Sequence, residues 1–179
     1  MMEIYTIGHG DKTFVKFVEM LHSFDIDHLV DVRSFPGSRK FPWFGKNEMS
    51  YYLPLMGISY SHMPELGGFR KKHVCSCDDN AGWRLASFRN YADYCLYEKD
   101  FEEGIERLKT IAEKEKTAYM CSESVPWSCH RSIISDYMDR VHGWKVTHII
   151  GKEKSICNKI HDHAILKDNK LIYPKIDHD

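Results

Sequence analysis

Hydrophobic residues at the start of the chain alternate between short continuous runs and runs spaced by three or four positions. The run EIYTIG is followed by a glycine turn and then by DKTFVKFVEMLHSF, whose apolar positions fall on one helical face: Phe14, Phe17, Val18, Leu21 and Phe24. Asp11 or Thr13 can cap that helix. The apolar run HLVDV comes next. This order predicts a strand, a helix and a second strand joined as a right-handed parallel crossover.

The same patterns predict the remaining elements. We expect a short helix near 47–53, a strand at 58–63, helices at about 84–97 and 100–114, a strand at 117–121, a helix at 130–143, a strand in KVTHII, and a hairpin in AILKDNKLIYP that turns at Asp168 and Asn169. The chain of 179 residues is long enough for one well-packed domain. We therefore predict a single domain, 1–179, with a three-layer α/β fold, a mainly parallel sheet and a C-terminal β-hairpin.

Polar residues follow the first two predicted strands. His9 stands directly after EIYTIG, and Asp31 and Arg33 close the second run. Ligands of open parallel sheets bind where the carboxyl ends of the strands meet the amino ends of the helices. These three side chains are therefore expected at one edge of the sheet, with Asp31 and Arg33 as candidate substrate-binding residues and His9 as a candidate catalytic residue.

The densest group of reactive side chains lies in residues 117–132, TAYMCSESVPWSCHRS. After a short apolar run, the segment contains five such residues: Cys121, Glu123, Cys129, His130 and Arg131. The helical pattern that follows makes this segment a strand-to-helix turn. Because a helix N-terminus favours anions and lowers the pKa of nearby thiols, the turn is a candidate chemical site.

Two interpretations of that turn remain open. In the functional one, Cys129 and His130 form a thiolate that attacks an electrophile, Glu123 is a general acid or base with its pKa tuned by burial, and Arg131 binds an anion. In the structural one, Cys121 and Cys129 pack as small hydrophobic residues, and Arg131 pairs with Asp31 or Glu123.

Other segments offer candidate ligand contacts with equally plain structural alternatives. Arg39 and Lys40 stand beside Trp43 and Phe44, a pattern that could hold a nucleobase and its phosphate or could simply cover the core. The paired glycines Gly67 and Gly68 permit either close approach to a ligand or a tight turn. Tyr91, with Arg89 and Tyr94, could point to the site or pack.

Composition narrows the classes of protein. The formal net charge is −1, so no global basic field drives nucleic-acid binding, although a local patch remains possible. No signal segment or membrane-length apolar run occurs, so we expect a cytoplasmic protein without a membrane partner. The six cysteines are then expected to be free thiols or metal ligands. Cys75 and Cys77, with His73, could be half of a metal site or part of a surface lid.

The motifs TIGHG, LVDVRSFPGSRKFP, GISYSHMPELGG, FRNYADY and MCSESVPWSCHRSIISDYM, followed by GWKVTHI, resemble the successive signatures of domain-of-unknown-function family 488. The resemblance covers residues 4 to about 150. It implies a compact prokaryotic α/β domain whose motif set includes His9, Asp31, Arg33, Cys121, Glu123, Cys129, His130 and Arg131. Gly10 departs from it, since the family often has Ser there.

The VDVR strand and the later strand that ends in Cys are also loosely similar to rhodanese-type sulfurtransferases and cysteine phosphatases, within a loosely Rossmann-like layout. From Cys121 to Arg131 the loop is twice too long for their anion-binding loop, and from Cys129 to Arg131 it is too short.

Three hypotheses follow. The protein is an enzyme acting on a phosphorylated ligand, such as a nucleotide or nucleic acid, or a non-catalytic module binding a nucleotide or modified base, or a metal site built from Cys121, Cys129 and His130. The third is disfavoured because adjacent residues rarely both bind one ion. We expect no cofactor and no metal, and the oligomeric state stays open.

Overall fold

A computed structural model of the protein describes residues 1–74 and 78–177. The helices in this part of the chain are α1 (Phe14–Ser23), α2 (Lys46–Leu55), α3 (Ala86–Tyr97), α4 (Lys99–Ala112) and α5 (Arg131–Arg140). Short 3-10 turns are η1 (Pro42–Phe44), η2 (Pro64–Leu66), η3 (Asp78–Asn80) and η4 (Pro126–Ser128). The strands are β1 (Glu3–Gly8), β2 (His28–Asp31), β3 (Ser59–His62), β4 (Thr117–Cys121), β5 (Lys145–Gly151), β6 (Lys154–Cys157), β7 (Ile165–Lys167) and β8 (Lys170–Ile172).

The main sheet has six strands in the order β3-β2-β4-β1-β5-β6. The first five are parallel, and β6 runs antiparallel to β5 at one edge. Strand β4 lies between β1 and β2, with Cys121 opposite Gly8 and Met120 opposite Asp31. This register brings the carboxyl ends of three strands to neighbouring positions at the same edge.

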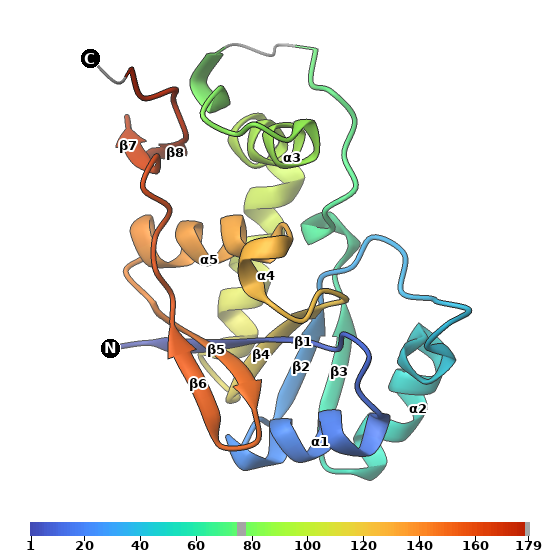
Figure 1. The fold of residues 1–179 in the computed structure, drawn as a ribbon. Helices are drawn as coiled ribbons and strands as arrows, with labels where there is room; N and C mark the ends of the chain where they lie inside the picture. The colour runs from blue at the N-terminus through green and yellow to red at the C-terminus, as the bar shows by residue number, and fades with distance from the viewer. Residues whose placement is uncertain (75–77, 178–179) are drawn as a thin grey trace.

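Helices cover both faces of the sheet, so the fold has three layers. In Figure 1, α1 and α2 lie below the sheet, while α3, α4 and α5 lie above it. Alternate residues of each strand pack into opposite layers: Val30 and Tyr119 face the cluster that includes α4 and α5, whereas Leu29 and Ala118 face the cluster that includes α1. This alternation follows from the two-residue side-chain period of a strand.

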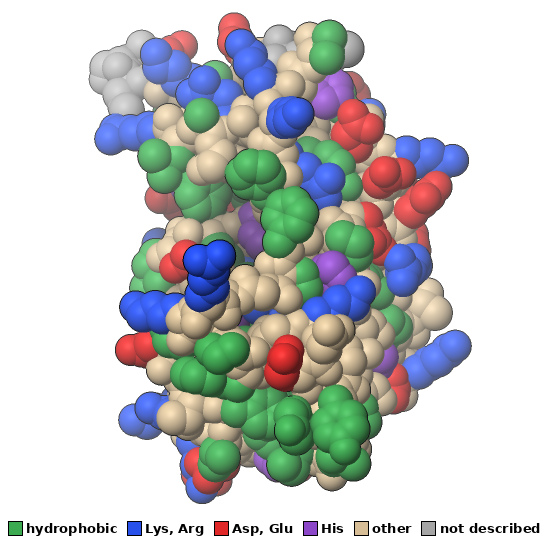
Figure 2. All heavy atoms as spheres, turned by 90° about the vertical axis from the view of Figure 1, so that its right-hand side faces the viewer, with side chains coloured by type: hydrophobic (Ala, Val, Ile, Leu, Met, Phe, Trp, Pro, Cys, Tyr) green, Lys and Arg blue, Asp and Glu red, His purple; other side chains and the backbone are tan. Residues whose placement is uncertain are grey.

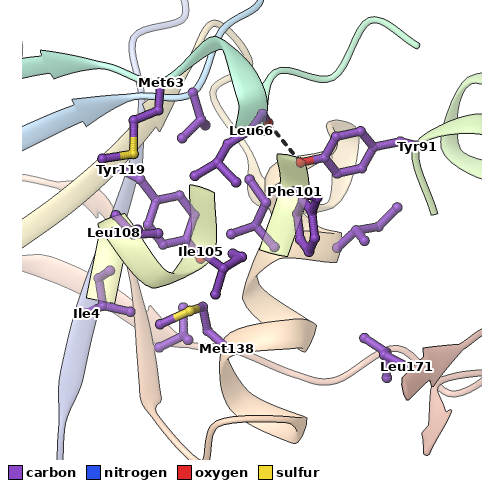
Figure 3. Packing of buried hydrophobic residues seen from close by; sticks show 14 of the residues in the cluster. Ile4, Met63, Leu66, Tyr91, Phe101, Ile105, Leu108, Tyr119, Met138 and Leu171 are labelled. Carbon is purple, nitrogen blue, oxygen red and sulfur yellow. Dashed lines mark hydrogen bonds between the residues drawn. The ribbon is translucent and has the colours of Figure 1, made fainter. Parts of the chain in front are cut away.

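The larger core lies between the sheet and helices α3 to α5. Figure 3 shows Met63, Leu66 and Tyr119 meeting Ile105 and other apolar side chains there. All four of these side chains are fully buried. Burial of one such large side chain contributes roughly 1.5–3 kcal/mol relative to an exposed one. The C-terminal hairpin of β7 and β8 extends this core through Leu171, so the hairpin is part of the same packing unit.

The predicted three-layer α/β architecture with its C-terminal hairpin is confirmed. Thr13, rather than Asp11, caps α1 by accepting a hydrogen bond from the Lys16 amide. Helix α5 ends at Arg140, earlier than predicted, with Gly143 in the left-handed region at φ 67°. Strand β6 was not predicted. The Cys75–Cys77 pair lies outside the described residues.

None of the helices in the described part of the chain has the length and apolar content that crossing a lipid bilayer requires.

Candidate functional site

A cavity of about 960 Å³ opens at the carboxyl ends of β1, β2 and β4. Seven of the predicted site residues line it: His9, Arg33, Gly68, Cys121, Glu123, Cys129 and His130. The convergence of the imidazole at position 9, the guanidinium at position 33 and the 121–131 turn on one cavity is the geometry that the strand order predicts.

The loop after β4 is held tightly against the end of β1. Backbone hydrogen bonding between the two segments continues past the ends of the strands. The amide of His9 donates to the carbonyl of Cys121 at 3.1 Å, and the amide of Gly10 donates to the carbonyl of Ser122 at 2.9 Å. A Cβ atom at Gly8 would overlap the carbonyl oxygen of Glu123. Glycine is therefore required at position 8 for the backbone of the turn to cross the first strand.

The side chain of Ser124 also reaches the first strand turn. Its hydroxyl oxygen lies where a side chain at Gly10 would begin. A hydroxyl group therefore lies beside Gly10, and Ser124 of the other loop supplies it.

Two thiols meet at the floor of the cavity. The Sγ atoms of Cys121 and Cys129 are 3.0 Å apart, and both side chains are buried. Cys121 ends β4 and Cys129 is the residue before His130, the N-cap of α5, so the strand and the helix place the two sulfur atoms in contact. The amide of Arg131 donates to the Cys129 sulfur at 3.4 Å. The first turn of α5 thus directs a backbone N–H group at a sulfur atom.

Ionisation of the two thiols is coupled because they share one hydrogen bond. Burial opposes ionisation of Cys121, but the hydrogen bond from Cys129 and the positive charge of Arg131 outweigh it and lower the pKa of Cys121. The contact with Cys121 and burial raise the pKa of Cys129 well above its ordinary value. The pair therefore holds one proton and one negative charge after its first ionisation.

Arg131 lies behind the sulfur atoms and does not line the cavity. It is 1% exposed, its Nη2 donates to the backbone carbonyl of Glu123 at 3.2 Å, and its Nε has no hydrogen-bond partner among the described residues. It pairs with neither of the carboxylates considered for it. The positive charge of this buried guanidinium is best compensated when one of the two neighbouring thiols is a thiolate.

Both histidines of the site are held in one tautomer by backbone carbonyls. Nδ1 of His9 donates to the carbonyl of Gly10 at 2.7 Å, and Nε2 of His130 donates to that of Val32 at 2.8 Å. The His9 ring also stacks on Phe44, with centroids 4.4 Å apart. Burial lowers the pKa of His9 and lowers that of His130 to about 4. Both rings are neutral at pH 7, and each keeps one nitrogen as an acceptor.

Asp31 and Arg33 form an internal ion pair. Nη2 of Arg33 donates to Asp31 Oδ2 at 2.7 Å, and its Nε donates to Oδ1 at 2.9 Å. The hydroxyl of Tyr60 donates to the same carboxylate at 2.5 Å, and the carbonyl of Phe44 accepts from Arg33 at 2.6 Å. Asp31 is fully buried beneath the cavity, whereas Arg33 lines it. Arg33 therefore reaches the cavity with most of its hydrogen-bonding capacity already engaged.

Glu123 is exposed, so the burial that was expected for this side chain is not found. Its backbone carbonyl accepts a hydrogen bond from Arg131, and the residue lines the cavity from a loop that is open to solvent. The loop runs through the turn η4, whose Pro126 is buried while Ser128 stays at the surface. A solvated carboxylate at the rim can still exchange a proton with a bound ligand.

The remaining predicted residues support the cavity from outside or lie at its margin. Gly67 and Gly68 permit close approach to protein groups, since Cβ atoms there would overlap Ser34 and the ring of His130. Tyr91 is fully buried, donates to the carbonyl of Leu66 and packs its ring against His130. Arg39 is exposed on the loop after β2 and is not among the lining residues.

Several lining residues were not singled out from the sequence. Six serines line the cavity: Ser34, Ser38, Ser87, Ser122, Ser124 and Ser128. The repeated serines of SESVPWSCH were the available signal for half of them. Phe35 and Phe69 also line the cavity, are 78% and 76% exposed, and meet edge to face. No periodic pattern marks these two aromatics, because they stand on separate irregular loops.

Within residues 1–74 and 78–177, no group of three or more His, Cys, Asp or Glu side chains is arranged to hold a metal ion. The Cys121–Cys129 contact brings together only two such side chains. There the adjacent imidazole of His130 is turned away toward the Val32 carbonyl.

Comparison with known proteins gives one match. No curated protein and no solved structure matches the chain. The family model described as Domain of unknown function DUF488 matches residues 13–138. The matched span includes Asp31, Arg33 and the complete 121–131 turn, and it begins just after His9. The protein with this thiol-floored cavity therefore belongs to the DUF488 family.

Proposed function

We propose that the protein is an enzyme that binds a phosphorylated ligand, a nucleotide or a nucleic-acid strand, in the cavity at the ends of β1, β2 and β4. The observation that carries the proposal is the convergence of His9, Glu123 and the Cys121–Cys129 pair on one cavity. Acid–base groups and thiols gathered from separate strands at the ligand-binding edge of a parallel sheet are typical of an enzyme site.

The margin of the cavity supports an anionic ligand with flat rings. The segment 33–46 contains four basic residues and no acidic one, and the segment 68–74 contains three basic residues and no acidic one. Arg39, Lys40, Lys71 and Lys72 are exposed. Figure 2 shows hydrophobic and basic side chains around a hollow on this side of the molecule, with a histidine visible inside it. This local charge contrasts with the near-neutral chain as a whole and suits phosphate groups.

Exposed rings beside those basic residues suit nucleobases. Phe35, Phe69 and Trp127 are each more than 60% exposed, and they come from three separate loops. Stacking of a base on an aromatic side chain is worth roughly 1–3 kcal/mol and tolerates any base sequence. The serine hydroxyls of the cavity can donate to phosphate oxygens. Together these groups favour a nucleotide or a single-stranded nucleic acid over a small inorganic anion.

Glu123 and His9 are the candidate proton-transfer groups. Because Nδ1 of His9 donates to the Gly10 carbonyl, its Nε2 is left to accept a proton. Glu123 is exposed and lines the same cavity from the loop after β4. A neutral imidazole and a carboxylate in one cavity can act as base and acid on a bound phosphoester or glycosidic bond.

The first test measures binding and turnover with a panel of mononucleotides and single-stranded DNA and RNA oligonucleotides. Tryptophan fluorescence reports binding through Trp127, and chromatography of the oligonucleotides reports turnover. We expect binding that weakens with salt. Glu123→Gln keeps the shape of the side chain, so affinity should stay within about twofold while turnover falls roughly 10²- to 10⁴-fold.

Glu113→Gln is the matched control. Glu113 is exposed at the end of α4, just before β4 begins, so it lies near the edge of the sheet that is opposite the cavity. It should change neither affinity nor turnover. Binding without any turnover in the wild-type protein would leave a nucleotide-binding module. Absence of binding across the whole panel would overturn the proposal.

A further inference from the structure

The contact between Cys121 and Cys129 is closer than packing of two small hydrophobic groups requires. Their sulfur atoms are 3.0 Å apart, which is within the sum of their van der Waals radii, and they need to approach by only about 1 Å to reach disulfide bonding distance. Both residues line the cavity, so the buried pair lies directly beneath a surface that a small solute reaches from solvent. Geometry and access are thus both present for a reaction between the two sulfur atoms.

The surroundings favour a reactive thiolate rather than an inert buried thiol. The guanidinium of Arg131 lies behind the pair with an unpartnered Nε, and the Arg131 amide donates to Cys129. These two positive features compensate one negative charge on the pair. Burial in an apolar pocket without them would keep both thiols protonated. The pair is therefore built to lose one proton.

We propose that Cys121 and Cys129 form a redox centre in which Cys121 reacts with a hydroperoxide and Cys129 then closes a reversible disulfide. If one cysteine carried a covalent substrate adduct, a second thiol in contact with it would attack and displace that adduct, so the second thiol has no role in such a reaction. It does have a role in resolving a sulfenic acid. The inference does not require the nucleotide ligand proposed above.

The reaction balances in two steps. The Cys121 thiolate attacks the terminal peroxide oxygen, so the O–O bond breaks, Cys121 becomes a sulfenic acid, and the alkoxide takes a proton to leave as an alcohol, or as water from hydrogen peroxide. The Cys129 sulfur then attacks the Cys121 sulfur, and the hydroxide leaves with the Cys129 proton as water. Two thiols are oxidised to one disulfide, one peroxide is reduced, and an external dithiol restores the thiols.

The disulfide would tie the end of β4 directly to the start of α5. The closed segment contains Glu123, whose carbonyl crosses Gly8 and whose side chain lines the cavity. Formation of the disulfide also removes the negative charge of the thiolate, which compensates the positive charge of Arg131. Oxidation is therefore expected to alter the cavity as well as the thiols.

Peptide mapping tests the proposal on the full-length protein without any nucleotide. No Lys or Arg lies between Lys116 and Arg131, so trypsin releases both cysteines in the single peptide TAYMCSESVPWSCHR. After brief treatment with hydrogen peroxide and then iodoacetamide, we expect this peptide to be lighter by two hydrogen atoms and to carry no alkyl group. Dithiothreitol should restore two alkylation sites.

Exposed Cys157 provides an internal comparison in the same digest. The buried pair should be oxidised at least about tenfold faster than Cys157, because its thiolate is stabilised. In Cys129→Ser, a dimedone adduct should accumulate on Cys121. In Cys157→Ser, the disulfide should form as in the wild type.

Full alkylation of the peptide after peroxide, or faster oxidation of Cys157, would overturn the proposal. A dimedone adduct on Cys129 in the variant Cys121→Ser, with none on Cys121 in Cys129→Ser, would overturn the assigned order. Because no ligand is present, a negative result leaves nucleotide binding intact. Failure of nucleotide binding likewise leaves the disulfide result intact.

Discussion

At the scale of single residues, the site is built mostly from groups that bind one another. Asp31 and Arg33 satisfy each other in the sequence pattern D-x-R, and the buried carboxylate receives a further hydrogen bond from Tyr60. The pattern shows that the two residues share a strand end, but not whether the guanidinium turns back to the carboxylate or outward to a ligand. That choice depends on the carbonyl of Phe44, which arrives from a loop whose course has no periodic signal.

Replacing Asp31 by Asn should strongly destabilise the protein, because it leaves the Arg33 guanidinium buried without its counter-charge. Breaking a buried pair in this way costs about 3–5 kcal/mol. Urea denaturation followed by circular dichroism measures the free energy of unfolding. As the control, Glu103→Gln removes the partner of Lys99 in an exposed helical pair and should change stability by less than about 1 kcal/mol. Equal effects from both variants would contradict a structural role for the Asp31–Arg33 pair.

At the scale of elements, periodicity predicted those parts of the fold that have one clear buried face. Helices α1 and α4 and strands β1, β2 and β4 follow their apolar patterns closely. Strand β6 was missed because all four of its residues are exposed and the two central residues of its turn with β5, Lys152 and Glu153, are not glycine, although Glu153 has φ 55°. Helix α2 was predicted too short, since it contains Pro54 and buries only Met49 and Leu53.

The same patterns located the candidate site but did not predict the contacts among the buried residues beneath it. The strand ends predicted which side chains share one edge of the sheet, and His9, Arg33 and the 121–131 turn do line one cavity. The S–S contact could not be predicted, because it depends on the path of the seven intervening residues through the turn η4. The burial of Arg131 behind the thiols has the same origin.

Gly8→Ala should disturb the turn after β4 without changing any charge. The added methyl group would overlap the Glu123 carbonyl, which is backbone and cannot rotate away. We expect a loss of stability of roughly 1–3 kcal/mol, the range for overpacking, and a slower closure of the Cys121–Cys129 disulfide. Gly37→Ala is the control, because nothing lies within 4 Å of a Cβ there. Unchanged unfolding and disulfide formation in Gly8→Ala would show that the turn can move freely.

At the scale of the whole molecule, buried ionisable groups make stability depend on pH. Burial lowers the pKa of His130 and of His148 to about 4 each, from an ordinary value near 6.5. Between these values the unfolded chain binds more protons than the folded protein, so each histidine lowers the free energy of unfolding as the pH falls. Asp136 acts in the opposite sense, because burial raises its pKa to about 6 and the folded state binds the extra proton.

The free energy of unfolding should therefore fall as the pH is lowered from 6.5 to 4, with the two histidines outweighing the one carboxyl group. Each fully acting group contributes up to about 1.4 kcal/mol per pH unit. Asp136→Asn should make the fall steeper over this window, and His148→Gln should make it shallower. Urea titrations at half-unit steps of pH give the slopes. A wild-type stability that rises toward pH 4, or identical slopes in the two variants, would contradict these assignments.

The position of β4 in the sheet has a consequence for how the chain acquires its structure. Strands β1 and β2 are close neighbours in the sequence, yet β4 separates them, and it enters only after residue 116. A nascent chain that has passed β3 still lacks the strand that joins its two halves, and it presents open strand edges on both. Long-range pairing of this kind slows folding and prolongs exposure of those edges. The arrival of β4 joins the sheet and places Cys121, and with it the thiol chemistry, in the same event.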